Sequence, residues 1–345
     1  MHIPFINVDI EPTNRCNAHC YFCPRDQTPH QGLMTGDVFD QALARAIEFR
    51  PLAAEHLGVE LKVNLCGLGE PLLNKRTPEF VGKIRAAGFE CSVSSNAALL
   101  DEARGRALLD AGLQGIEINV GEEGEDYDRI YGLPFDRTCD NVVRFAEMAG
   151  DQCQVRIVLV NHRRDTEHIA KMTRFWRDRG IKHFLPFNIM NRAGALFVDE
   201  MQYEAYPERE LAEEMLRARG SDPVCPVPFV FLFVGYDGQY YLCCSDWKKE
   251  APLGSVFDES FSTVVGRKLE HVTTREPICR SCNHDPVNRL TEELHARADR
   301  AEETSIDAFL DEILDADRSA RGVAEALGAE IGSQRARRRI QVTAL

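Results

Sequence analysis

Residues 3–23 read Ile-Pro-Phe-Ile-Asn-Val-Asp-Ile-Glu-Pro-Thr-Asn-Arg-Cys-Asn-Ala-His-Cys-Tyr-Phe-Cys, an apolar strand pattern followed at once by three cysteines. Three residues separate Cys16 from Cys20, and two separate Cys20 from Cys23. A short loop with this spacing turns three thiolates toward one point. Iron–sulfur clusters that only carry electrons usually have four cysteine ligands, so three ligands on a four-iron cluster leave one iron open to a small molecule. The alternatives are unrelated thiols or a zinc site, but zinc motifs normally supply four ligands.

Strand-like apolar runs alternate with amphipathic helical stretches on both sides of this loop. The strand candidates are residues 3–10, 60–66, 90–95, 115–120, 154–160 and 183–188. The helix candidates are residues 38–50, 78–87, 101–111, 135–148 and 166–179. Repeated strand–helix units predict parallel strands with right-handed crossovers. Six units predict an α/β fold, an open partial (β/α)6 TIM barrel whose active site lies at the carboxyl ends of the strands. The cysteine loop follows the first strand, so it belongs to that face.

The pattern changes after this barrel, and we predict three domains, over residues 1–195, 196–285 and 286–345. In the second, a helix pattern covers 207–219, two strand-like runs, 229–234 and 239–243, flank a Gly-containing turn, and a further helix pattern covers 257–269. This arrangement predicts a β-hairpin followed by a helix. The last sixty residues are charged and Ala-rich, which indicates a helical extension.

The bulk composition narrows the classes of protein that fit. The chain has 345 residues, 44% of them hydrophobic, and a net charge of −14. Such a surface repels nucleic acid and attracts a cationic substrate, although solubility alone also explains it. No apolar run approaches the roughly 20 residues of a membrane span, and the N-terminus lacks signal-peptide features. We therefore expect a cytoplasmic protein without membrane or nucleic-acid partners, in which the twelve cysteines serve metal or redox chemistry.

The first cysteine loop resembles the signature loop of the radical S-adenosylmethionine (SAM) enzymes, in which Phe22 occupies the usual aromatic position. The resemblance extends over about the first 190 residues. It implies a [4Fe–4S] cluster on Cys16, Cys20 and Cys23 whose open iron binds SAM. It also implies an electron donor such as flavodoxin or ferredoxin, because the cluster must be reduced before it cleaves SAM.

Further segments match the family at the ends of later strands. Gly67-Leu68-Gly69-Glu70-Pro71 resembles the Gly-Gly-Glu motif, whose backbone and glutamate would bind the amino group of SAM. Ser94 and Asn96 at the end of the third strand, and Asn119 at the end of the fourth, are at positions where members of this family contact the ribose or carboxylate of the cofactor. Ordinary turns and loop caps are the alternative for all of them. Arg192, after the sixth strand, would pair with the substrate or with the carboxylate of the cofactor. The alternative interpretation, a solvated arginine in a turn, explains this residue equally well.

A second set of cysteines comprises Cys225, Cys243, Cys279 and Cys282. Four cysteines hold either a [4Fe–4S] cluster or a structural zinc, and composition does not separate the two. Seventeen residues separate Cys225 from Cys243. This gap and the order of the four cysteines resemble the "twitch" form of the SPASM domain in radical SAM dehydrogenases of aminoglycoside biosynthesis, such as 2-deoxy-scyllo-inosamine dehydrogenase. This resemblance implies one auxiliary [4Fe–4S] cluster. A longer SPASM domain would bring more cysteines after Cys282, and the sequence has none.

Cys244 stands beside Cys243, and successive side chains on a strand point to opposite faces. Three roles are therefore open for Cys244: it is the cluster ligand in place of Cys243, a buried spare thiol, or a hydrogen-atom donor. The histidines His162, His183 and His284 show no ligand spacing, so we assign them no metal.

The resemblance implies that a radical from SAM takes a hydrogen atom from a carbinol carbon of a small cationic sugar or aminocyclitol. The single auxiliary cluster then favours oxidation of this secondary alcohol to a ketone, with the cluster as electron acceptor. The alternatives are an aminoglycoside epimerase with Cys244 as hydrogen donor, a radical diol dehydratase, a peptide-modifying radical SAM enzyme, and a non-catalytic scaffold protein.

Overall fold

The computed structural model describes residues 5–163, 165–193, 195–196, 203–250, 252–274, 277–299 and 305–342. At its centre lies a curved sheet in which six strands run parallel in the order β6-β5-β4-β3-β2-β1. These strands are β1 (Phe5–Ile10), β2 (Glu60–Leu65), β3 (Glu90–Ser95), β4 (Gly115–Asn119), β5 (Gln154–Asn161) and β6 (His183–Asn188). The expected partial barrel is therefore confirmed.

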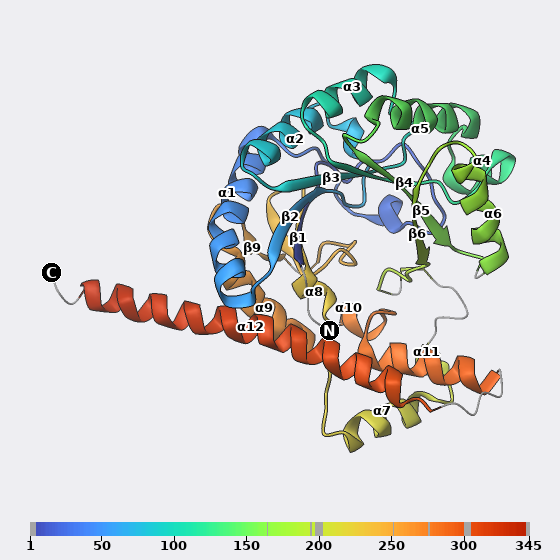
Figure 1. Cartoon of the computed structure of the whole chain (residues 1–345). Coiled ribbons are helices and arrows are strands. Elements are labelled where there is room, and N and C mark those ends of the chain that lie inside the picture. Colours follow the sequence, from blue (N-terminus) through green and yellow to red (C-terminus); the bar gives the residue numbers. More distant parts are fainter. Residues whose placement is uncertain are drawn as a thin grey trace.

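Helices cover the outer, convex face of this sheet (Figure 1). They are α1 (Gly36–Leu52), α2 (Thr77–Ala86), α3 (Glu102–Asp110), α4 (Gly124–Tyr131), α5 (Phe135–Ala149) and α6 (Thr166–Arg177). Short helical turns are η1 (Pro24–Gln27), η2 (Ala53–Leu57), η3 (Pro71–Leu73) and η5 (Tyr203–Ala205). Helix α4 has no counterpart among the predicted elements, because its eight residues are too few and too charged to show a clear helical period.

Each strand of the barrel divides its side chains between the two faces of the sheet. In β1, Ile6 and Val8 are fully buried in the core shared with the outer helices. Asp9 lies on the inner face, where Asn64 of β2 donates a hydrogen bond to its Oδ1 at 3.0 Å. Ser92 of β3 in turn donates to Oδ1 of Asn64 at 2.8 Å. The inside of the barrel is thus lined with polar groups at this level, which suits a polar ligand.

The predicted hairpin joins the same sheet. Strand β7 (Phe231–Val234) pairs in parallel with β1, on the side away from β2, and β8 (Gln239–Tyr241) and β9 (Pro252–Ser255) follow antiparallel. Strand β7 begins two residues later than predicted, because residues 227–230 form the short helix α8 (Val227–Val230). The second run ends at Tyr241, so Cys243 and Cys244 lie beyond the strand. Strand β9 was not predicted.

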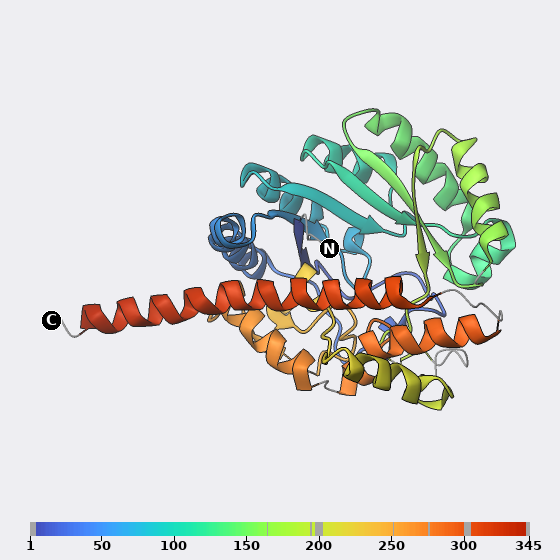
Figure 2. The ribbon, with the colours of Figure 1, turned by 60° about the horizontal axis from the view of Figure 1, so that its bottom comes forward.

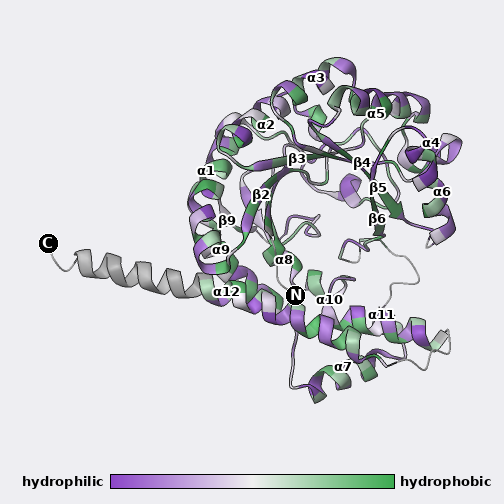
Figure 3. Cartoon of the chain, in the orientation of Figure 1, coloured by the Kyte–Doolittle hydropathy of each residue, from purple (hydrophilic) through white to green (hydrophobic). Residues whose placement is uncertain are grey.

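The remaining helices form a layer beneath the open side of the barrel. They are α7 (Arg209–Ala218), α9 (Phe261–Thr274), α10 (Pro277–Arg280), α11 (Pro286–Asp299) and α12 (Asp307–Val342). Helices α7, α11 and α12 share a small second core, formed by Ala212, Leu216, Val287, Leu290, Leu310 and Ile313. Figures 1 and 2 show α12 running beside α9 and α11. Hydrophobic and hydrophilic residues alternate along α7 and α11 in Figure 3, as expected for helices with one buried face.

Candidate functional site

The cysteine loop and the glycine turn meet in one cavity of about 290 Å³ at the carboxyl ends of the barrel strands. Most of the residues that the sequence singled out line this cavity together. They are Cys16, Cys20, Phe22, Cys23, Gly67, Gly69, Glu70, Ser94, Asn96, Asn119 and Arg192. Pro71 is buried beside them at the start of η3. The sequence indicated these residues separately, and the barrel brings them to one place.

The two glycines allow the turn to lie directly against the cysteine loop. A Cβ atom at Gly67 would stand 2.5 Å from Cγ of Glu11, and one at Gly69 would overlap the carbonyl oxygen of Thr13. The backbone N–H of Glu70 donates to the carbonyl oxygen of Arg15 at 2.8 Å. The turn and the loop are therefore one packed unit, which explains the need for glycine in physical terms.

Glu70 is buried, with 1% of its surface exposed, and it accepts three hydrogen bonds from the protein. The donors are the backbone N–H groups of Leu72 at 3.0 Å and Asn96 at 2.7 Å and the hydroxyl of Ser95 at 2.9 Å. Burial raises the pKa of Glu70, and these hydrogen bonds oppose the rise. The carboxylate of Glu70 therefore joins the end of β3 to the glycine turn. Glu70 also forms part of the cavity wall.

The three thiols of the loop suit a multiply charged metal cluster. Burial raises the pKa of Cys16 to about 11, and the nearby Glu70 and Cys23 add to the effect. Burial also raises the pKa of Cys20, where the other two thiols contribute. Asn96 donates from Nδ2 to Sγ of Cys16 at 3.7 Å. Three neighbouring thiolates in a partly buried site need a strong positive charge to be stable, and bound iron would supply it.

The four later cysteines line a separate, mainly apolar cavity. Cys225, Cys243, Cys279 and Cys282 all contribute to its wall, and Cys244 does not. The Cys244 thiol lies within electrostatic range of Arg192, Asp9 and Lys268, and also of Cys282. This arrangement favours Cys243 as the ligand. Within the described ranges, no three His, Cys, Asp or Glu side chains are arranged to hold a single metal ion.

One segment connects the two cavities. Met190 and Arg192 line the first cavity, and between them the buried Asn191 donates from Nδ2 to the carbonyl oxygen of Ser281 at 2.5 Å. The backbone N–H of Asn191 donates to Oδ1 of Asn283 at 3.2 Å, and the N–H of Asn283 donates to Oδ1 of Asn191 at 3.1 Å. Ser281 and Asn283 flank Cys282, so this clasp holds the end of β6 against the second cysteine set.

Arg192 follows the clasp in a left-handed backbone conformation, with φ of 49°. Such a conformation is uncommon for a residue with a side chain and is found where surrounding contacts impose it. Among the described residues that line the first cavity, Arg192 carries the only positive charge. Burial lowers the pKa of the neighbouring His284 to about 4, and the charges of Arg192 and Arg289 contribute.

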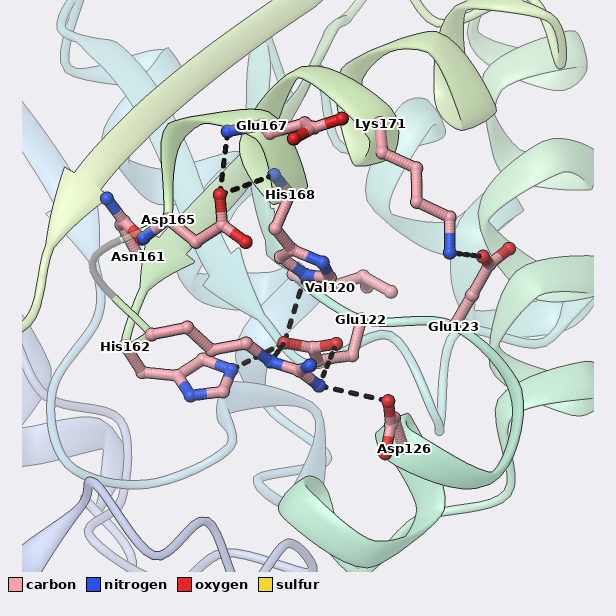
Figure 4. A network of polar contacts seen from close by, with 12 residues as sticks. Val120, Glu122, Glu123, Asp126, Asn161, His162, Asp165, Glu167, His168 and Lys171 are labelled. Carbon is pink, nitrogen blue, oxygen red and sulfur yellow. Dashed lines mark hydrogen bonds and ion pairs between the residues drawn. The ribbon is translucent and has the colours of Figure 1, made fainter.

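A polar network beside the cysteine loop was not anticipated from the sequence (Figure 4). Glu122 is buried and accepts hydrogen bonds from Nε2 of His162 at 2.5 Å and from Nη2 of Arg163 at 2.9 Å. Nδ1 of His162 lies 2.7 Å from the hydroxyl of Tyr21, and its ring stacks on Phe22. The network therefore anchors the loop between Cys20 and Cys23. Its members come from separate parts of the chain, so no local motif reveals it.

No helix in the described part of the chain is both long and apolar enough to cross a membrane.

Two family models match the chain. The model of the Radical SAM superfamily matches residues 10–175, and the SPASM model, described as an iron–sulfur cluster-binding domain, matches residues 225–283. A probable GTP 3',8-cyclase of Methanothermobacter marburgensis is 31% identical over 183 residues, which cover 51% of this chain and 55% of that protein. The chain thus spans about half the length of this curated relative.

Solved structures show a similar fold. Native anSMEcpe with bound AdoMet superposes with a TM-score of 0.55 and 14% identity, covering 84% of this chain and 96% of that one. SuiB of Streptococcus suis bound to S-adenosylmethionine superposes with a TM-score of 0.57 and 13% identity, covering 82% and 72%.

Proposed function

Because the chain is a radical SAM enzyme with a SPASM-type iron–sulfur domain, we propose that it oxidises a secondary alcohol of a small cationic sugar or aminocyclitol to a ketone. Its cofactors are SAM and two iron–sulfur clusters. SAM and the first cluster supply the radical that takes a hydrogen atom from the carbinol carbon, and the second cluster supplies the electron acceptor. The substrate loses the equivalent of two hydrogen atoms: one hydrogen atom from carbon, then one proton and one electron.

The observation that carries this proposal is the short connection between the two cysteine sets. Met190 and Arg192 line the cavity of the first set, while Asn191, between them, is hydrogen-bonded to the residues on either side of Cys282. A substrate radical in the first cavity is therefore separated from the second set by a single backbone segment. This proximity supports electron transfer from substrate to the auxiliary cluster. The net charge of −14 supports a cationic substrate.

In this proposal the cavity residues bind and orient the reactants. Cys16, Cys20 and Cys23 would hold the first cluster. The backbone of Gly67 and Gly69 and the side chains of Ser94, Asn96 and Asn119, which line the same cavity, would surround SAM. Glu70 keeps the glycine turn in place through its three hydrogen bonds. Arg192 pairs with a carboxylate or an oxygen of the bound reactants, because it is the positive charge available there.

Epimerisation is the second candidate, because Cys244 interacts with Arg192, which lines the cavity. A thiol that donates a hydrogen atom must reach the substrate radical, and Cys244 does not line the cavity itself. This placement supports oxidation over epimerisation.

Cyclisation of GTP, the activity named for the sequence relative, receives less support from the cavity. A triphosphate is normally bound by several cationic groups. Arg192 is the only such group among the described residues of the cavity wall.

Turnover with a panel of aminocyclitols and aminoglycoside intermediates tests the proposal, with products identified by mass. Loss of two hydrogens with formation of 5'-deoxyadenosine supports oxidation. An unchanged mass with inverted stereochemistry indicates epimerisation, and loss of water indicates dehydration; either result rejects the proposed oxidation.

A further inference from the structure

Helix α11 presents one polar face to a second, larger cavity. Arg289, Glu292, Glu293 and Ala296 recur every three or four residues, so they lie on the same side of the helix. All four line a cavity of about 630 Å³. The opposite side of α11 packs into the small core shared with α7 and α12. The C-terminal helices thus form a folded unit that supports this polar wall.

This second cavity adjoins the first. Phe187, Ile189 and Met190, at the end of β6, line both of them. The far wall carries the amide groups of Asn161 and Asn188, from the ends of β5 and β6. A molecule bound here with one end in the first cavity would place that end beside the cysteine loop. The arrangement is that of a binding site for the non-reacting part of a substrate.

The charged groups on α11 are held in place and are predominantly acidic. Glu293 accepts from Nε of Arg297 at 2.6 Å, and Glu292 accepts from the hydroxyl of Tyr203 at 3.2 Å. The guanidinium of Arg289 donates to Glu312 at 2.9 Å, and Arg297 pairs with Glu293 in the same way, so these two ion pairs balance and Glu292 adds a further carboxylate to the wall. Two oriented carboxylates with two amides opposite suit a ligand that has both ammonium and hydroxyl groups.

We propose that this second cavity is the recognition site for a small polyhydroxylated amine, with its ammonium group against Glu292 and Glu293 and its hydroxyl groups on Asn161 and Asn188. The proposal rests on the proposed function, since it names the substrate class and the part of the chain that selects it. It also gives the C-terminal helices a role, which is to close the open side of the partial barrel with a selective wall.

Binding measured without reductant separates this inference from the proposed reaction, because no turnover occurs. The probes are 2-deoxystreptamine, a diaminocyclitol, and its di-N-acetyl derivative, each titrated calorimetrically into the reconstituted enzyme with SAM. We expect the diamine to bind the wild type, and the Glu292→Gln/Glu293→Gln variant to bind it at least about tenfold more weakly. The variant should not change the affinity for the acetylated probe.

Two further variants complete the experiment. Glu210→Gln/Glu214→Gln removes two exposed carboxylates of α7 outside the cavity and controls for the change in net charge. Asn188→Ala tests the opposite wall if the double variant melts below the wild type, and it should weaken the diamine severalfold. The inference is overturned if the wild type does not bind the diamine, if it binds both probes equally, or if the folded variants bind like Glu210→Gln/Glu214→Gln. Diamine binding without ketone formation would reject the proposed reaction and leave this inference standing.

Discussion

Nζ of Lys249 lies 2.9 Å from Oε2 of Glu11, and both side chains are almost completely buried. Lys249 belongs to the iron–sulfur domain and has a left-handed backbone, with φ of 57°. Oε1 of Glu11 accepts from the backbone N–H of Leu68, inside the glycine turn, at 3.0 Å. One carboxylate therefore connects the end of β1, the glycine turn and the iron–sulfur domain.

The Lys249→Met variant leaves the buried Glu11 without its cation. Removal of one partner of a buried ion pair costs about 3 kcal/mol, so we expect the free energy of unfolding to fall by that amount and the affinity for SAM to fall with it. Lys248→Met is the matched control, since Lys248 is exposed, and it should change neither quantity. Urea unfolding and SAM titration of both variants give the comparison. If the two variants had the same free energy of unfolding and the same affinity for SAM, the proposed coupling between the two domains would be rejected.

The glycine turn gives a steric prediction. Gly69→Ala places a Cβ atom against the backbone of Thr13 and Arg15, where no side chain is able to move away. We expect this variant to lose SAM binding and to reconstitute the first cluster poorly. Gly82→Ala is the control, because Gly82 lies in α2 with open space around its Cα, and alanine there should stabilise the protein by about 0.5–1 kcal/mol. Retained SAM binding in Gly69→Ala would show that the turn is not packed as described.

Asp9 predicts a specific pH dependence. Burial raises the pKa of Asp9 from 3.8 to about 6, against the opposing hydrogen bond from Asn64. Between these values the folded protein holds a proton that the unfolded chain releases. The free energy of unfolding of the metal-free protein therefore falls as pH rises through this window, by up to about 3 kcal/mol from this group. Urea unfolding of Asp9→Asn should lack this component, whereas parallel pH profiles of the two proteins would exclude it.

The placement of Cys243 and Cys244 predicts different iron contents. Cys243→Ala removes a residue from the wall of the apolar cavity that Cys225, Cys279 and Cys282 also line, so anaerobically reconstituted protein should lose about half of its iron and sulfide. Cys244→Ala should keep the full content and still oxidise substrate. If Cys244→Ala lost iron and Cys243→Ala did not, Cys244 would be the cluster ligand in place of Cys243.

Apart from residues 3 and 4, which lie outside the described part of the chain, the six barrel strands agree with their predicted ranges within one residue. Alternation and glycine stop signals are local properties of the sequence, which explains this agreement. The pairing of β7 with β1 is not local, since more than 200 residues separate Asn7 from Phe231. No single-sequence pattern specifies it.

Most of the candidate site could be predicted because its residues come directly after barrel strands, whose ends converge. The contacts that hold the site together could not. Glu122 meets His162, and Asn191 meets Asn283, through the tertiary fold. Likewise, Cys243 and Cys244 are chemically identical neighbours beyond the end of β8, and only the tertiary fold distinguishes them, because Cys243 lines the cavity of the later cysteines and Cys244 does not.

The central claim is oxidation at a carbinol carbon. It is tested most directly with an aminocyclitol substrate that carries deuterium at that carbon. We expect 5'-deoxyadenosine to acquire one deuterium and the substrate to become a ketone in equal amount. Unlabelled 5'-deoxyadenosine from every labelled position, or labelled 5'-deoxyadenosine with a product that has kept its alcohol, would contradict the account.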